Sequence, residues 1–140
     1  MVKQISAFLE NRPGRLAEVT RYLADSGINL LAVSLADTTD FGILRIIASE
    51  PDKACEVLRQ QELRVKVTQV VAVELMDQPG SLADVLALLN EHHIAIEYMY
   101  ALSGQSGPFV VLRLSDQEES LKKLENCRIS FIEPQGIGQI

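Results

Sequence analysis

The amino-acid sequence overlays itself when it is shifted by 66 positions, and this internal repeat constrains the fold more than any other feature. The segment LENRPGRLAEV, which begins at Leu9, aligns without a gap with LMDQPGSLADV, which begins at Leu75. The match extends onward, so that Ile28 aligns with Ile94. A chain of 140 residues has room for two small domains of one kind, and we expect them at residues 1–67 and 68–140.

Each copy has the pattern strand, helix, strand, strand, helix, strand. The spacing of apolar residues predicts elements of the first copy at 3–10, 14–26, 29–36, 41–48, 51–60 and 63–67, with a polar loop at 37–40. The second copy predicts them near 69–76, 80–92, 95–102, 108–114, 117–126 and 129–133, with a hairpin loop at 104–107 and a short tail from 135. This order predicts an α+β fold of two ferredoxin-like βαββαβ units, with antiparallel sheets and helices on one face.

The middle strands of the first copy are apolar on both faces. The runs at 30–33 and 43–47 do not alternate with polar residues, as a strand exposed on one side would. Helices cover one face of such a sheet, and the other face needs a second sheet, from the sister repeat or from a second chain. We therefore expect a homodimer.

Composition and charge exclude several classes of protein. With 47% hydrophobic and 23% charged residues, the chain is not of a disordered type. The net charge of −6 arises entirely within residues 67–140, which contain ten acidic and four basic residues. This negative charge disfavours nucleic acid as a partner. No apolar run approaches the roughly 18 residues of a membrane helix. Two cysteines do not make a disulfide framework, so we expect a cytoplasmic protein.

Two short motifs carry the strongest local signal, Asn11-Arg12-Pro13-Gly14 and Asp77-Gln78-Pro79-Gly80. Proline followed by glycine predicts a type II turn, and each motif lies between the first strand and the first helix of its copy. The N-terminus of a helix readily binds a carboxylate, while Asn11 or Asp77 can accept a hydrogen bond from an ammonium group. The combination suits a free amino acid, although Pro-Gly also serves simply as a turn.

The segment ENRPGRLAEVTRYLADSGINLLAVSL resembles the ACT domain, a small-molecule sensing module of amino-acid metabolism. The second copy, MDQPGSLADVLALLNEHHIAIEYMY, is a looser match, and together the two segments make the chain similar to stand-alone tandem ACT proteins of bacteria. Such proteins have no attached catalytic domain. The resemblance implies an amino acid bound at the interface between ACT units, against the Pro-Gly loop of one unit and the second strand of its neighbour.

The resemblance also assigns the residues of such a site. In the first copy Asn11, Pro13, Gly14 and Leu16 match the family's loop and Asn29 matches the asparagine that opens the second strand; in the second copy the matches are Asp77, Pro79, Gly80 and Leu82. The neighbouring Arg12, Arg15, Leu30 and Ser81 complete the predicted ligand-binding set. Leu9 replaces the histidine of serine-sensing members, so serine is not implied. Because Ala95 replaces the second asparagine, we expect the better site at the first loop, although Asn29 also fits an ordinary loop residue.

Other reactive residues fit structural roles better. The pair His92-His93 lacks the spacing of metal ligands, and Cys55 and Cys127 look like small core residues rather than nucleophiles. We thus predict no catalytic residue, no metal and no cofactor. The predicted function is a non-catalytic amino-acid sensor that acts on an unidentified enzyme or regulator. The alternatives are a dimerisation or interaction module without a ligand, and a small ferredoxin-like enzyme. The identity of the amino acid and of the pathway does not follow from the sequence.

Overall fold

The computed structural model describes residues 1–37, 40–104 and 106–137, and the chain divides into two compact units. The N-terminal unit is Lys3–Thr68, and the C-terminal unit combines Met1–Val2 with the chain from Gln69 onward. Three predicted features lie partly outside the described residues: Thr38 and Thr39 of the polar loop, Gln105 of the hairpin loop, and the tail after Ile137.

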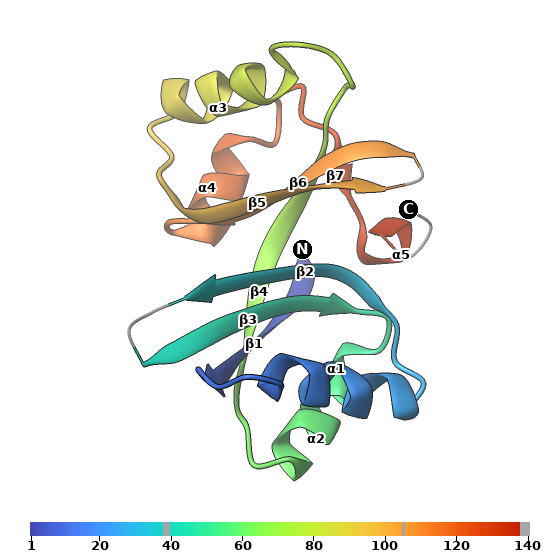
Figure 1. The fold of residues 1–140 in the computed structure, drawn as a ribbon. Coiled ribbons are helices and arrows are strands. Elements are labelled where there is room, and N and C mark those ends of the chain that lie inside the picture. The colour runs from blue at the N-terminus through green and yellow to red at the C-terminus, as the bar shows by residue number, and fades with distance from the viewer. Residues whose placement is uncertain (38–39, 105, 138–140) are drawn as a thin grey trace. The chain divides into compact units, whose positions relative to one another are not determined.

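The N-terminal unit is a four-stranded antiparallel sheet with two helices on one face (Figure 1). The order of its strands is β2-β3-β1-β4. Its elements are β1 (Val2–Glu10), α1 (Arg15–Asp25), β2 (Leu30–Asp37), β3 (Phe41–Ala48), α2 (Pro51–Gln60) and the first part of β4 (Arg64–Glu74). The predicted elements of the first copy through the second helix are confirmed to within one or two residues.

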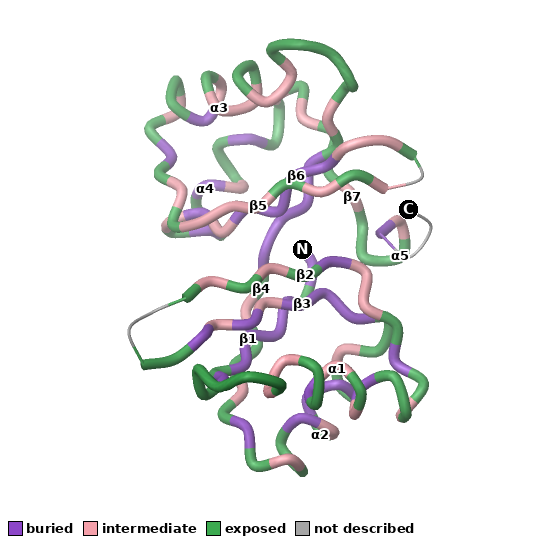
Figure 2. The backbone as a smooth tube through the Cα atoms, in the orientation of Figure 1, coloured by how far each residue is buried: buried purple, intermediate pink, exposed green. Residues whose placement is uncertain are grey.

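The core of this unit lies between the sheet and its helices. Alternate residues of β1 and β3 face the helices, and α1 and α2 meet them with residues spaced by three and four positions. The buried members are Ile5, Ala7, Leu9, Val19, Leu23, Ile28, Leu44, Ile46, Ala48, Ala54, Cys55, Leu58 and Leu63. Figure 2 shows the opposite sides of both helices exposed to solvent.

The C-terminal unit repeats the same order of elements. It contains the rest of β4, followed by α3 (Ser81–Glu91), β5 (Ile96–Gly104), β6 (Gly107–Leu114), α4 (Gln117–Lys123), β7 (Phe131–Ile132) and α5 (Pro134–Ile137). The order of its strands is β7-β4-β6-β5. The order of the N-terminal unit, read from the opposite edge as β4-β1-β3-β2, matches it strand by strand. The fold class is therefore confirmed as two ferredoxin-like βαββαβ units.

The structure differs from the sequence prediction around the join and near the C-terminus. The strands predicted at 63–67 and 69–76 form the single strand β4, because the segment is rich in β-branched residues and contains no Gly, Pro or Ser. The predicted helix at 117–126 ends earlier, with Leu124 as its C-cap, and the last strand has only two residues. The short helix α5 lies where we expected only a tail.

The two equivalent helices α1 and α3 end in the same way, although the residues at the turn differ. The amide of Ile28 donates to the carbonyl of Leu23 at 3.0 Å, and that of Ile94 donates to the carbonyl of Leu89 at 2.9 Å. These bonds close a Schellman motif, which needs a residue with positive φ just before the isoleucine. Gly27 fills that position at φ 75°, and His93 fills it at φ 56°.

Replacing His93 by glycine should stabilise the C-terminal unit. A side chain in the left-handed region costs about 1 kcal/mol, which His93→Gly relieves and His93→Ala does not. The reverse change at the equivalent position of the first copy, Gly27→Ala, should lower the free energy of unfolding by about 1 kcal/mol. This cost comes from the backbone alone, since a Cβ at Gly27 meets no atom within 4 Å. Urea unfolding measures all three free energies. A destabilising His93→Gly would show that the histidine side chain contributes more than its backbone costs.

Candidate functional site

Both Pro-Gly motifs form the predicted type II turns. Gly14 has φ 83° and ψ −10°, and Gly80 has φ 91° and ψ −8°, which are the angles of the third residue of such a turn. The turns are closed by backbone hydrogen bonds from Arg15 to Arg12 at 3.3 Å and from Ser81 to Gln78 at 3.4 Å. Each turn leads directly into a helix, and in the described residues no side chain caps either N-terminus.

The first loop places two arginines at the N-terminus of α1, and both are paired with glutamates. Arg12 and Arg15 each place a guanidinium nitrogen 3.0 Å from the same oxygen of Glu18, and Arg12 also reaches Glu10 at 3.3 Å. The side chain of Arg15 is only 12% exposed. Its buried Nε has no hydrogen-bond partner among the described residues. A buried donor without an acceptor is costly.

The ion pairs shift the pKa values of Glu18 and Arg12. The hydrogen bonds from Arg15 and Arg12 lower the pKa of Glu18 below its ordinary value. The pKa of Arg12 is raised, chiefly by its hydrogen bond to Glu18 and next by its hydrogen bond to Glu10. Glu18 therefore stays ionised over the physiological range and holds the two guanidinium groups beside the turn.

Asn11 contacts a residue that the sequence analysis did not single out. Its Nδ2 donates to Oδ1 of Asp37, the last residue of β2, at 3.4 Å. With its amide nitrogen turned toward Asp37, the carbonyl oxygen of Asn11 is the atom that can accept a hydrogen bond from a ligand. Asp37 is 26 positions away, and only the antiparallel path of β2 and β3 brings it to the loop.

Asn29 and Leu30 do not join Asn11 within one unit. Leu30 pairs with Ala48 at one end of the β2 and β3 hairpin, whereas Asp37 pairs with Gly42 at the other end. An eight-residue strand is about 25 Å long, so the two predicted halves of the site lie far apart in a single unit. The backbone of Asn29 is held by Ser49, through hydrogen bonds of 3.0 and 2.9 Å.

The second loop lines a hollow of about 430 Å³ in the C-terminal unit. The predicted residues Asp77, Pro79, Gly80, Ser81 and Leu82 all line it. The hydroxyl of Ser81 accepts a hydrogen bond from the amide of Met76 at 2.8 Å, which closes the loop on itself. Gln78 and Ser81 stand where the first loop has its two arginines, so this loop lacks their positive charge.

The two predicted leucines that follow the turns pack against the cores. Leu16 packs against the core of the N-terminal unit, and Leu82 against that of the C-terminal unit. Both are partly buried, so they anchor their helices beneath the turns rather than leaving the apolar face open.

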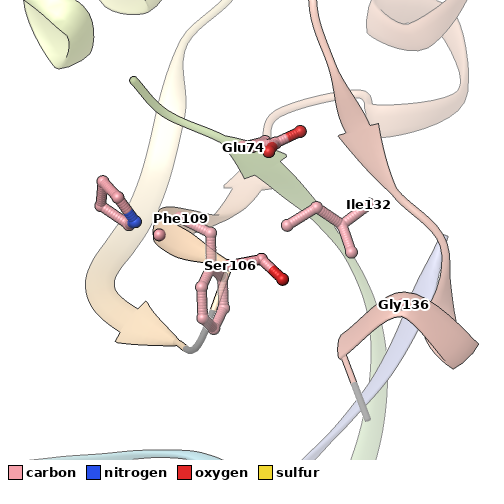
Figure 3. Close-up of a pocket in the computed structure, with 7 residues that line it drawn as sticks. Glu74, Ser106, Phe109, Ile132 and Gly136 are labelled. Atoms are coloured by element: carbon pink, nitrogen blue, oxygen red, sulfur yellow. The ribbon is translucent and has the colours of Figure 1, made fainter. Parts of the chain in front are cut away.

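A second cavity of the C-terminal unit lies outside the predicted set (Figure 3). Its volume is about 190 Å³, and its lining includes Glu74, Ser106, Phe109, Ile132 and Gly136. The ionisable side chain in this lining is a carboxylate, so the cavity suits a cation or an apolar group better than an anion.

One pair of side chains that we had assigned to structural roles meets in the structure. Sγ of Cys127 lies 3.2 Å from Nε2 of His92, the residue that follows α3 as its C-cap. The described residues hold no group of three or more His, Cys, Asp and Glu side chains placed to bind a metal. In the same described ranges no helix is long and apolar enough to cross a membrane.

Comparison with known proteins identifies the family. The ACT domain pair profile matches residues 1–140, the whole of the sequence. The chain belongs to the ACT domain pair family. ACT domains are regulatory, and here two of them follow one another in tandem, in accord with the repeat and with the two βαββαβ units.

Solved structures show the same fold. Protein BT0572 from Bacteroides thetaiotaomicron shares 39% identity and superposes with a TM-score of 0.92, over 99% of this chain and 96% of that one. The regulatory subunits of aspartate kinase from Thermus thermophilus and Thermus flavus share 17% and 16% identity, with TM-scores of 0.62 and 0.59. Both matches cover 87% of this chain and 89% of the other. Among curated proteins no match was found.

The ion pairs of the first loop predict a shifted titration of Glu18. Because its pKa in the folded protein is lowered, the pairs stabilise the fold above the ordinary range of a glutamate and are lost as the pH falls through the lowered value. In an NMR titration Arg15→Gln should raise the midpoint of the Glu18 carboxyl. Arg59→Gln, in the last turn of α2, is the matched control and should leave it in place, because Arg59 does not contribute to the shift of Glu18. Equal midpoints in Arg15→Gln and wild type would contradict the assigned pairs.

Proposed function

We propose that this ACT domain pair is a non-catalytic regulatory protein that binds a free amino acid at the first Pro-Gly loop. The observation that carries the proposal is the uncapped N-terminus of α1 beside Arg15, whose buried Nε has no acceptor among the described residues. A helix N-terminus with an adjacent guanidinium favours a carboxylate. The second loop has the same turn but carries Asp77 and no arginine, which disfavours a carboxylate there.

The other end of an amino acid would meet Asn11 and Asp37. The carbonyl oxygen of Asn11 accepts a hydrogen bond from the ammonium group, and the carboxylate of Asp37, 3.4 Å from the amide nitrogen of Asn11, adds negative charge beside it. Positive charge on one side of the loop and negative charge on the other match the two charges of a free amino acid. A simple anion would use only the first half of this arrangement.

We further propose that a second copy of the chain completes the site. Asn29 and Leu30 lie at the opposite end of β2 from the loop, so they reach an Asn11 site only when they come from another copy. The edge strand β2 exposes Val33 and Leu35, at 40% and 51%, and a homodimer would cover them. The ligand would then lie at an interface between ACT units of two chains.

The remaining parts of the proposal concern boundaries and partners. We propose ACT domains at residues 1–67 and 68–140, and a cytoplasmic protein whose two cysteines serve as thiols. Binding would shift the equilibrium between two arrangements of the protein only as far as the amino acid prefers one of them. The output then passes to a partner enzyme or regulator.

Valine substitutions at the two glycines separate binding from folding. Gly14→Val and Gly80→Val impose the same left-handed strain, since both glycines have φ near 90° and a Cβ at either meets no atom within 4 Å. Both variants should lose comparable stability. Only Gly14→Val should lose ligand binding, because its side chain enters the space in front of α1.

A thermal-shift screen against the twenty amino acids measures both effects. For a dissociation constant near 100 μM, about 10 mM ligand adds roughly 2.7 kcal/mol, which raises the melting temperature by about 5–10 °C. Wild type and Gly80→Val should respond to the same amino acid, and Gly14→Val should not. A response retained in Gly14→Val would refute the site. Flat curves throughout would favour an interaction module without an amino-acid ligand.

A further inference from the structure

The contact between Cys127 and His92 places a nucleophile beside a base outside the ligand site. Sγ of Cys127 lies 3.2 Å from Nε2 of His92, and the thiol also lies 3.8 Å from the carbonyl oxygen of Lys123. The two residues are 35 positions apart. His92 is the C-cap of α3 and Cys127 lies in the segment after α4, so no sequence motif joins them. A nucleophile with a base in hydrogen-bonding reach is the arrangement that activates a thiol.

Both side chains are accessible in part. Cys127 and His92 are half-buried, so a small reagent can approach the sulfur without unfolding of the unit. Cys55 offers a contrast within the same chain, because it is 4% exposed in the core and its burial raises the pKa of its thiol. The two thiols of this protein therefore lie in opposite environments.

We propose that Cys127 is a modification site that reacts with low-molecular-weight disulfides, with His92 as the base. Nε2 of His92 takes the proton of the thiol, and the resulting thiolate attacks one sulfur of the disulfide. The S–S bond of the reagent breaks as the bond to Cys127 forms. The departing thiolate takes up the proton from His92, so that one disulfide and one thiol become a mixed disulfide and one thiol.

The modification would act on the C-terminal unit. Cys127 packs at the margin of the core that contains Leu89 of α3 and Leu124 at the end of α4. A group attached to its sulfur has to displace these neighbours or turn out toward solvent with the segment that follows α4. The mixed disulfide should therefore lower the melting temperature of the protein, and a thiol reductant should restore it.

Dithiodipyridine tests the site, because each thiol that reacts releases a coloured thiopyridone. In the folded protein one thiol should react fast and the other slowly. The fast reaction should be absent in Cys127→Ser and retained in Cys55→Ser. His92→Asn should slow the fast phase about tenfold or more. His93→Asn, the exposed neighbour in the same turn, is the matched control and should leave the rate unchanged.

The direction of the His92→Asn effect separates a base from a packing residue. Loss of packing alone would expose Cys127 further and speed its reaction, whereas loss of the base slows it. Melting curves of the variants verify that each one is folded during the assay. Equal rates for Cys127 and Cys55, or an unchanged or faster Cys127 in His92→Asn, would overturn the proposal.

Discussion

In both units, a glycine in the left-handed backbone conformation directly after a proline sets the path of the chain. At Gly14 and Gly80 the backbone adopts φ near 90°, which side chains rarely tolerate, and this single step turns the chain from the first strand into the first helix. The leucine two positions later packs into the core and fixes the helix against the sheet. The same turn leaves the N-terminus of the helix uncapped by any described side chain, and this is the feature of the first loop to which we propose that a carboxylate binds.

The two copies have kept the turn and differ in the charges around it. Arg12 and Arg15 share the carboxylate of Glu18 beside the first turn, whereas Gln78 and Ser81 occupy the equivalent positions beside the second. Ser81 instead closes its loop with a hydrogen bond to the backbone of Met76. One backbone geometry thus supports a charged loop in one unit and a neutral turn beside an acidic residue in the other. This difference is why we propose the first loop, and not the second, as the ligand site.

Local patterns predicted what depends on local chemistry. The period of apolar residues placed α1 and α2 within a residue or two, and the Pro-Gly pairs gave the turn type. Contacts between residues far apart in the sequence could not be predicted. The contacts of Asn11 with Asp37 and of Cys127 with His92 depend on how strands and helices pack. The register sets Asn11 and Asn29 at opposite ends of β2. Whether they share a site therefore depends on a second unit, which local sequence patterns do not describe.

The most direct test of the account follows the backbone amides of both loops by NMR. An equimolar mixture of the twenty protein amino acids is added to the labelled protein, and the shifts of the amides are compared. If the amino acid binds at the first loop, the largest changes are expected at the backbone amides of Leu16 and Ala17. The side-chain amide of Asn11 should also shift, and the backbone amides of Ser81–Ala83 should change little. Changes confined to the second loop, or none at either loop, would contradict it.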